Sequence, residues 1–264
     1  MSSESNPSAP SRIAVAIPCY NEAAAIGDLV ERWTRALPGA EILVFDNNSN
    51  DATALLAQAA GARVVPVPQQ GKGRVVQAIF EQLQDRDAVI MTDGDGTYPP
   101  EDARRLLKPV LAGEADMVVA ARQPVQEAGR SAMHPVRGLG NALIRTGFRV
   151  MLGRGPGDLL SGYRVFGPEF LKHVKPRSSG FEIETELTGH AVARGYRVVE
   201  LAVPYYPRAE GTESKLRAGR DGLRILFMIV RLAFRLRPWR ILLFLSSILL
   251  GAVIALITLR GRLF

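Results

Sequence analysis

The chain is predicted to fold as an α/β domain with a mostly parallel β-sheet covered by helices on both faces. Apolar, β-branched runs alternate with helical patterns between residues 12 and 121, and this alternation is typical of parallel sheets. Polar clusters follow three of the strand-like runs, and such sheets bind ligands beyond the carboxyl ends of their strands. The 264 residues suffice for one large domain of this class and an additional segment.

Each element of this alternation has its own signal. Predicted strands are short apolar runs rich in Val and Ile, over residues 13–17, 41–46, 63–67, 88–91 and 116–120. Predicted helices have apolar residues three and four apart, and they cover residues 23–37, 51–60, 72–83 and 101–111. Beyond residue 121 the pattern weakens, and the predicted elements are helices over 141–152 and 181–193 and a strand over 196–203.

The C-terminal part of the chain is basic and apolar. Residues 208–240 contain nine Lys or Arg and three Asp or Glu, so they carry most of the net charge of +7. Arginines and apolar residues at helical spacing over 221–236 favour a helix in a membrane interface over an ordinary surface helix. Residues 241–259 carry no charge. As a helix they would be about 28 Å long, so we predict a transmembrane helix there rather than a buried core helix.

These features bear on location and domain organisation. Basic residues before the apolar segment predict a main domain on the cytoplasmic side of the inner membrane. Nucleic-acid binding is disfavoured, because the positive charge is confined to this block rather than spread along a groove. The single cysteine, Cys19, excludes an intrachain disulfide. We divide the chain into a disordered N-terminus without a signal peptide, an α/β domain, an interface helix, a transmembrane helix and a tail, over residues 1–11, 12–216, 217–240, 241–259 and 260–264.

The most informative motif is Asp93-Gly94-Asp95-Gly96-Thr97, which follows the strand-like run 88–91. Two carboxylates at a strand end offer the oxygen ligands of Mg²⁺, which is usually held by one or two carboxylates and substrate phosphates. The glycines let a ligand approach the backbone closely. An acidic turn is the alternative interpretation, but the other strand ends favour a site for a metal and a diphosphate.

Two further polar clusters, 18–22 and 46–51, end the first and second predicted strands. Their Asn and Asp side chains can accept hydrogen bonds from a base or a ribose, while Ser49 or Asp51 can equally serve as a helix N-cap. Gly71-Lys72-Gly73 opens a predicted helix, where backbone N–H groups and a lysine favour phosphate. The motif lacks the spacing of a P-loop.

Together these motifs resemble the family 2 glycosyltransferases, whose nucleotide-diphosphosugar-binding fold is called GT-A. The resemblance covers residues 12–236, and within the family the chain is most similar to polyprenyl-phosphate (dolichyl-phosphate) hexose synthases. Three further motifs carry this closer likeness, at residues 158–164, 180–186 and 208–216.

The resemblance implies roles for individual residues on the donor side. Those expected to bind the nucleotide sugar are Pro18, Tyr20, Asn21, Glu22, Asp46, Asn48, Lys72, Asp93, Gly94, Arg208 and Lys215. Asp93, Asp95 and Thr97 would hold Mg²⁺ or Mn²⁺. Related synthases often carry a glutamine where this chain has Thr97, a poorer ligand, so water and the donor diphosphate are expected to complete the metal's coordination.

On the acceptor side the resemblance assigns Arg122 and Arg137 to the acceptor phosphate. Asp95, Asp158, Arg164 and Glu184 complete the expected catalytic set. A phosphate monoester has a second pKa of about 6, so a lipid phosphate is a nucleophile near neutral pH and needs a general base less than a sugar hydroxyl does.

The expected function is inverting transfer of a hexose or N-acetylhexosamine from a UDP- or GDP-linked sugar to a polyprenyl phosphate, for a glycan of the cell envelope. The partners are therefore a sugar nucleotide, a lipid and a membrane, and a homo-oligomer is left open. One alternative is transfer to a sugar hydroxyl of a glycolipid or polysaccharide, with Glu184 or Asp158 as the essential base. Another is a non-catalytic membrane adaptor that binds a sugar nucleotide.

Overall fold

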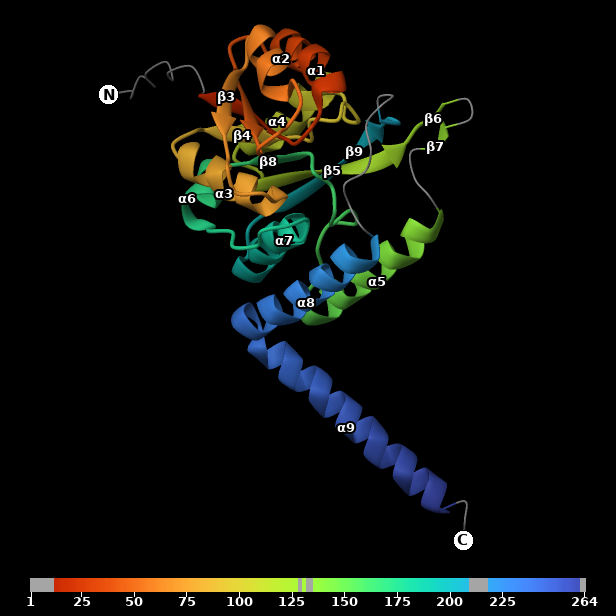
Figure 1. Cartoon of the computed structure of the whole chain (residues 1–264). Helices are drawn as coiled ribbons and strands as arrows, with labels where there is room; N and C mark the ends of the chain where they lie inside the picture. The colour runs from red at the N-terminus through yellow and green to blue at the C-terminus, as the bar shows by residue number, and fades with distance from the viewer. Residues whose placement is uncertain (1–11, 128–129, 132–134, 209–217, 262–264) are drawn as a thin grey trace, which may run out of the picture.

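The computed structural model describes residues 12–127, 130–131, 135–208 and 218–261. Within these residues, seven strands form a sheet with helices on both faces (Figure 1). The strand order is β3-β2-β1-β4-β8-β5-β9, in which β8 is antiparallel to both neighbours and the other pairs are parallel. The predicted α/β class with a mostly parallel sheet is therefore confirmed.

The strands of this sheet are β1 Ile13–Cys19, β2 Glu41–Asp46, β3 Arg63–Pro66, β4 Ala88–Met91, β5 Met117–Pro124, β8 Arg164–Phe166 and β9 Val198–Tyr205. A separate antiparallel pair consists of β6 Gln126–Glu127 and β7 Arg130–Ser131. The helices are α1 Ala23–Ala36, α2 Thr53–Ala59, α3 Lys72–Gln82, η1 Pro100–Asp102, α4 Ala103–Leu111, α5 Pro135–Met151, α6 Pro168–His173, α7 Ile183–Arg194, α8 Ala218–Leu236 and α9 Pro238–Gly261.

The sheet is buried on both faces, which explains why its strands have continuous apolar sequences. On one face, Val15 of β1 lies in a cluster with Trp33 of α1 and residues of α4. On the other face, Ala14 lies in a cluster with Phe80 of α3 and residues of α6 and α7. Successive residues of a strand thus contribute to the two halves of the core.

Several elements differ from those predicted, among them the two-residue strands β6 and β7, which are absent from the prediction. β8 is absent from the prediction, because it is three residues long and begins with Arg164. It joins the sheet through pairing with distant strands, which local sequence does not encode. α6 begins with Pro168, a residue favoured in the first helical turn. α5 begins at Pro135 rather than at residue 141, because Gly138 and Gly140 weaken the helical signal.

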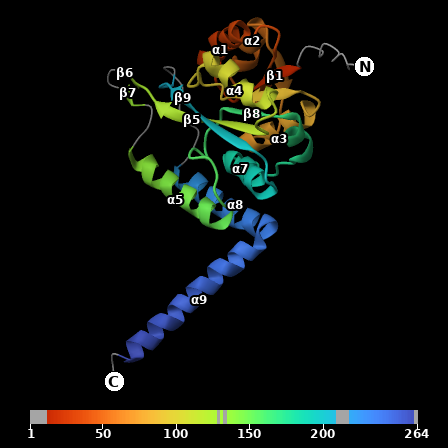
Figure 2. The ribbon, with the colours of Figure 1, turned by 180° about the vertical axis from the view of Figure 1, so that it is seen from behind.

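A third group of helices covers the side of the sheet that carries β5 and β9 (Figures 1 and 2). α8 packs against both α5 and α7, and Ile225 and Ile229 are buried in this contact. The opposite side of α8 exposes Leu223 and Phe227, which are 70% and 71% exposed. α8 thus has a buried apolar side, and its exposed side carries apolar residues as well as arginines.

α9 forms a helix over the predicted apolar segment and extends away from the sheet (Figure 1). In the part of the chain that the structure describes, no helix combines the length and the apolarity needed to cross a membrane. The transmembrane helix predicted over 241–259 is therefore not found among these residues and stays a prediction. A run of uncharged residues predicts an apolar helix, but it does not distinguish a helix that spans a bilayer from one that lies against another apolar surface. Residues 1–11 and 262–264 of the predicted termini lie outside the described residues.

The contact between α7 and α8 depends on Gly189. A Cβ atom at this position would lie 2.2 Å from Cδ2 of Leu232. Gly189→Ala is therefore expected to lower the free energy of unfolding by about 1–2 kcal/mol, because overpacking outweighs the gain in helix propensity. Chemical denaturation measures this change. Gly222→Ala on α8, where nothing lies within 4 Å of the added atom, is the control, and equal stability of the two variants would contradict the close contact.

Candidate active site

The carboxyl ends of the parallel strands bring the three polar clusters of the sequence to the same edge of the sheet. Cys19 at the end of β1 is in register with Asp46 at the end of β2. β4 lies on the other side of β1 and ends at Met91, two residues before Asp93. The predicted gathering of residues 18–22, 46–51 and 93–97 is therefore seen in the structure, as expected for ligand sites of such sheets.

The two carboxylates of the Asp93-Gly94-Asp95 motif each contact a basic side chain from another element. Nζ of Lys72, at the start of α3, lies 2.6 Å from Oδ1 of Asp93 and 2.6 Å from Oε1 of Glu184 on α7. Nη2 of Arg208, which follows β9, lies 2.7 Å from Oδ2 of Asp95. Acidic and basic groups therefore alternate where a diphosphate and a cation are expected.

Charge pairing keeps Asp93 and Lys72 ionised despite their partial burial. Burial by itself would raise the pKa of Asp93, but the nearby charge of Lys72 and the hydrogen bond from it hold that pKa below its usual range. Burial would likewise lower the pKa of Lys72, but Asp93 and Glu184 raise it above its usual range. Both groups are charged at neutral pH.

Thr97 orients Asp95. Its hydroxyl and its backbone N–H donate to Oδ1 of Asp95 over 2.7 and 3.1 Å, and its side chain is fully buried. Thr97 therefore positions the carboxylate of Asp95. Its own role as a metal ligand stays a prediction.

Two glycines allow close approaches around the motif. A Cβ atom on Gly94 would lie 2.4 Å from Sγ of Cys19 on β1, so the absence of a side chain lets the motif pack on the end of that strand. A Cβ atom on Gly162 would lie 2.4 Å from Oδ2 of Asp93. The backbone of the 158–164 segment therefore contacts the carboxylate of Asp93 directly. A contact of Gly94 with the donor stays a prediction.

The start of α3 is held by a loop that precedes α7. Cβ atoms on Gly71 and Gly73 would lie 2.2 and 2.0 Å from the carbonyl oxygens of Ser179 and Ser178, and the N–H of Gly73 donates to Ser179. Glu186 in turn accepts a hydrogen bond from the backbone N–H of Ser178 over 2.7 Å and another from the backbone N–H of Arg177. Glu186 thus supports the segment that carries Lys72. The sequence signal for it is the second glutamate of the Glu184-Thr185-Glu186 motif, to which no role was assigned.

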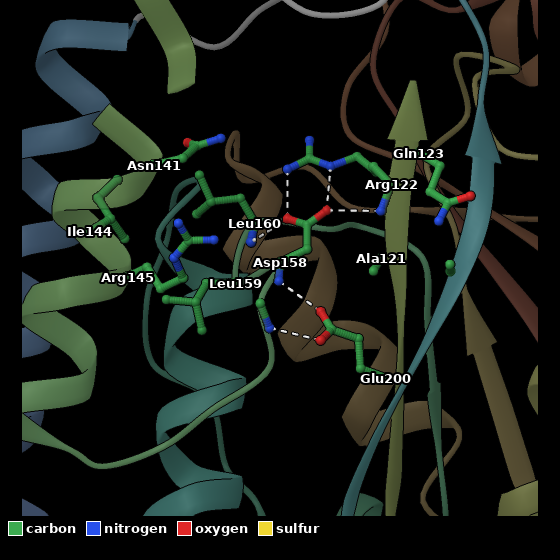
Figure 3. A pocket seen from close by; sticks show the side chains of 12 residues that line it. Ala121, Arg122, Gln123, Asn141, Ile144, Arg145, Asp158, Leu159, Leu160 and Glu200 are labelled. Atoms are coloured by element: carbon green, nitrogen blue, oxygen red, sulfur yellow. Dashed lines mark hydrogen bonds and ion pairs between the residues drawn. The ribbon is translucent and has the colours of Figure 1, made fainter. Parts of the chain in front are cut away.

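On the acceptor side, Arg122 near the end of β5 is held by Asp158 (Figure 3). Its Nε and Nη2 donate to the two carboxylate oxygens over 2.7 and 2.8 Å, and its backbone N–H donates over 3.1 Å. Burial would raise the pKa of Asp158, but the hydrogen bonds and charge of Arg122 keep it below its usual range. The arginine is therefore fixed in place by an ionised partner.

Glu200 of β9 supports this pair and was not singled out from the sequence. Its two carboxylate oxygens accept hydrogen bonds from the backbone N–H groups of Gly157 and Asp158 over 2.9 and 2.8 Å (Figure 3). Two consecutive backbone donors thereby orient Asp158, which orients Arg122. No local pattern reveals this role, because Glu200 lies 42 residues from Asp158.

Arg164 has a supporting position inside the core. Its side chain is 0% exposed, and its guanidinium donates to the carbonyl groups of Leu159 and Ser161 and to the hydroxyl of Thr188, each over 2.9 Å. Burial lowers the pKa of Arg164 to about 10, so it is charged at neutral pH. Arg164 fixes the 158–162 segment from inside the core, and a catalytic role for it stays a prediction.

The residues expected to bind the nucleotide line the ends of β1 and β2. Asn21 and Asn48 have positive φ angles of 54° and 63°, a conformation that asparagine tolerates better than most residues. The backbone N–H of Asn21 donates to the hydroxyl of Ser49 over 3.0 Å, and the N–H of Ser49 donates to Asp46 over 3.3 Å. The two strand ends are thus tied together, and Pro18, Tyr20 and Glu22 adjoin them. Their contacts with a base or ribose stay predictions.

Two expected site residues cannot be placed as side chains. Arg137 belongs to the first part of α5, whose side chains are outside those described, and Lys215 lies in the segment 209–217, outside the described residues.

A divalent cation at this edge of the sheet would need oxygen ligands. The described residues contain no group of three or more His, Cys, Asp or Glu that could hold a metal. Asp93 and Asp95 nevertheless place two carboxylates at this edge, where each contacts a basic group within 2.7 Å. This donor set fits Mg²⁺ or Mn²⁺, which take few protein ligands and complete their coordination with water and substrate phosphates.

Comparisons with known proteins agree with this geometry. The profile of the family described as Glycosyl transferase family 2 matches residues 14–174. Glycosyltransferase AglJ of Haloferax volcanii is 36% identical over 224 residues, which cover 85% of this chain and 73% of the relative. The dolichyl-phosphate hexose transferase of the same organism is 30% identical over 226 residues, which cover 85% of this chain and 96% of the relative.

A solved structure has the same fold. Glucosyl-3-phosphoglycerate synthase of Mycobacterium tuberculosis superposes with a TM-score of 0.69 at 23% identity, over 84% of this chain and 81% of that enzyme. The same enzyme has been crystallised with Mn²⁺, uridine-diphosphate-glucose and phosphoglyceric acid. The likeness confirms a GT-A-like α/β fold.

Proposed function

Because this chain belongs to glycosyl transferase family 2 and is a glycosyltransferase, we propose that it transfers a hexose or N-acetylhexosamine from a UDP- or GDP-linked sugar to a polyprenyl phosphate. The name of the dolichyl-phosphate hexose transferase, which aligns over nearly its whole length, supports a lipid phosphate as the acceptor. Divalent metal dependence is part of the proposal and is supported by the structural relative that contains Mn²⁺.

The observation that carries the choice of acceptor is the state of the carboxylates that could act as a general base. Asp158 accepts hydrogen bonds from Arg122 on both of its oxygens. Glu184 is 3% exposed and pairs with Lys72. A sugar hydroxyl needs a base within reach of its proton, whereas a phosphate monoester is already ionised near neutral pH. Carboxylates occupied by basic groups therefore favour the phosphate acceptor over the hydroxyl acceptor.

The proposed mechanism is a single displacement. An oxygen of the acceptor phosphate attacks the anomeric carbon, and the bond from that carbon to the nucleoside diphosphate breaks, which inverts the configuration. Lys72 and Arg208 face the departing diphosphate and stabilise its charge. Arg122, oriented by Asp158, binds the acceptor phosphate. Asp93 and Asp95 would hold Mg²⁺ or Mn²⁺, which when bound neutralises charge that develops on the leaving diphosphate.

A lipid acceptor also requires the site to meet a membrane surface, and we include that surface in the proposal. α8 carries exposed Leu223 and Phe227 beside exposed Arg224 and Arg231. Apolar side chains mixed with arginines suit the interface of an anionic leaflet. The basic character of this segment supports the cytoplasmic leaflet, where sugar nucleotides are found.

The test is transfer by the purified full chain in detergent micelles. With Mg²⁺ or Mn²⁺, a panel of UDP- and GDP-sugars and undecaprenyl phosphate, we expect a lipid-phosphate sugar with at least one donor, detected by mass spectrometry. The corresponding polyprenol, which lacks the phosphate, is the control acceptor. Product from the polyprenol or from a sugar acceptor alone would contradict the phosphate assignment. Binding of a sugar nucleotide without transfer to any acceptor would favour the adaptor.

A further inference from the structure

A cavity of about 410 Å³ lies beside Arg122, near the carboxyl end of β5 (Figure 3). β5 and β9 form one wall, α5 forms the other, and residues 157–160 line it between them. The proposed function uses Arg122 and Asp158 from this cavity and assigns no role to Asn141 or Arg145.

The two acidic side chains in the cavity wall are occupied by internal contacts. Asp158 accepts from Arg122 and from the N–H of Leu160, and Glu200 accepts from two backbone N–H groups. Their charges are compensated by groups that belong to the protein. An entering anion would therefore meet carboxylates whose hydrogen-bonding capacity is already used.

The basic side chain opposite them is available. Arg145 of α5 lines the cavity and is exposed, and the described residues provide it with no hydrogen bond or ion pair. Asn141 lies four residues before it on the same face of α5 and also lines the cavity (Figure 3). A guanidinium and an amide thus face the cavity from α5, while Arg122 faces it from β5. Groups of this kind recognise the several oxygens of a phosphate.

The apolar part of the cavity indicates what is attached to the phosphate. Leu159 and Ile144 line it, and both also belong to the cluster of apolar residues between α5 and α8. The cavity is therefore continuous with the helices that expose Leu143 and Phe227, at 60% and 71%. A phosphate bound between the arginines could extend an apolar chain toward these helices.

We propose that Arg145 binds the phosphate monoester of the lipid acceptor from α5, opposite Arg122. This inference rests on the proposed function and adds a specific residue to it, two helical turns beyond Arg137. Arg145 needs no rearrangement of existing ion pairs to bind an anion, because its guanidinium is engaged by none of the described groups. Arg122 reaches the phosphate with the N–H groups that Asp158 leaves free.

The experiment is direct binding, which does not depend on sugar transfer. The full chain in detergent micelles is titrated calorimetrically with farnesyl phosphate, with farnesol and with glycerol 3-phosphate. Arg145→Gln is expected to weaken farnesyl phosphate binding by about tenfold or more, the effect of losing a charge-assisted hydrogen bond. Arg149→Gln, one turn further on α5, exposed and outside the cavity lining, removes the same charge and is expected to change binding by less than about twofold.

Several outcomes would overturn the inference. If the two substitutions weaken farnesyl phosphate binding equally, Arg145 contributes only the general attraction of a positive charge for an anionic lipid. Equal binding of farnesyl phosphate and farnesol by the unaltered chain would exclude a phosphate site, and binding of glycerol 3-phosphate as tight as that of farnesyl phosphate would exclude a lipid-specific one. If Arg145→Gln weakens phosphate binding selectively but the unaltered chain transfers no sugar from any donor, the inference holds and the proposed function fails.

Discussion

Replacing Asp95 by asparagine is expected to reduce turnover by roughly 10³-fold, the scale of losing a major electrostatic contribution to the transition state. Asparagine keeps an oxygen that can accept the two hydrogen bonds from Thr97, so the turn is retained. It replaces the other oxygen by an amide N–H, which would face Nη2 of Arg208 where the present contact is 2.7 Å. The loss therefore falls on the diphosphate and metal side of the site and leaves the fold intact.

Two measurements separate this effect from unfolding. Thermal unfolding of Asp95→Asn should resemble that of the unaltered chain, while binding of Mn²⁺ in the presence of UDP, followed by electron paramagnetic resonance, should weaken strongly. Asp116→Asn is the matched control, because Asp116 pairs with Arg197 over 2.9 Å just before β5 begins, at the opposite edge of the sheet. Asp116→Asn should retain activity. Retained activity in Asp95→Asn would overturn the assignment of Asp95 to the metal.

Most of the fold could be predicted because local sequence patterns indicate most of its helices and strands. The β-branched runs at residues 13–17 and 88–91 became β1 and β4, and the apolar spacing around Trp33 became α1. β8 was not predicted, because three residues beginning with Arg164 have no strand pattern of their own. They form a strand because β4 and β5 pair with them on both sides. The predicted bilayer span over 241–259 rested on composition alone, and composition does not determine what an apolar helix packs against.

The candidate site was predictable to the extent that parallel strands fix it. Residues 18–22, 46–51 and 93–97 had to meet, because the carboxyl ends of parallel strands share one edge. Other contacts join segments that are distant in sequence: Lys72 pairs with Glu184, Arg164 donates to Thr188, and Glu200 accepts from residues 157–158. These contacts depend on how the elements pack together, for which motif spacing carries no information.

Gly162 shows how such a distant contact determines the shape of the site. A Cβ atom on it would lie 2.4 and 2.6 Å from the two carboxylate oxygens of Asp93, well inside van der Waals contact. The segment around Gly162 is not free to retreat. The hydroxyl of Ser161 donates to the carbonyl of Ala120 over 2.6 Å, and Arg164 donates to the carbonyl of Ser161 over 2.9 Å. The carboxylate of Asp93 must therefore move instead, and it would leave its contact with Lys72.

Gly162→Ala is accordingly expected to lower activity by about 100-fold or more, as misplacement by about 1 Å can do, while the free energy of unfolding falls by only about 1–2 kcal/mol. The stability cost is limited because the clash is relieved by rotating one short side chain at the edge of the sheet. Calorimetric titration with UDP and Mn²⁺, compared with chemical denaturation, measures both effects.

Gly27→Ala on α1, where nothing lies within 4 Å of the added atom, tests whether glycine replacement alone has an effect. This variant should bind UDP and Mn²⁺ as the unaltered chain does. If Gly162→Ala binds the nucleotide and metal as the unaltered chain does, then Asp93 need not hold its observed position for donor binding, and the importance of its contact with Lys72 would have to be rejected.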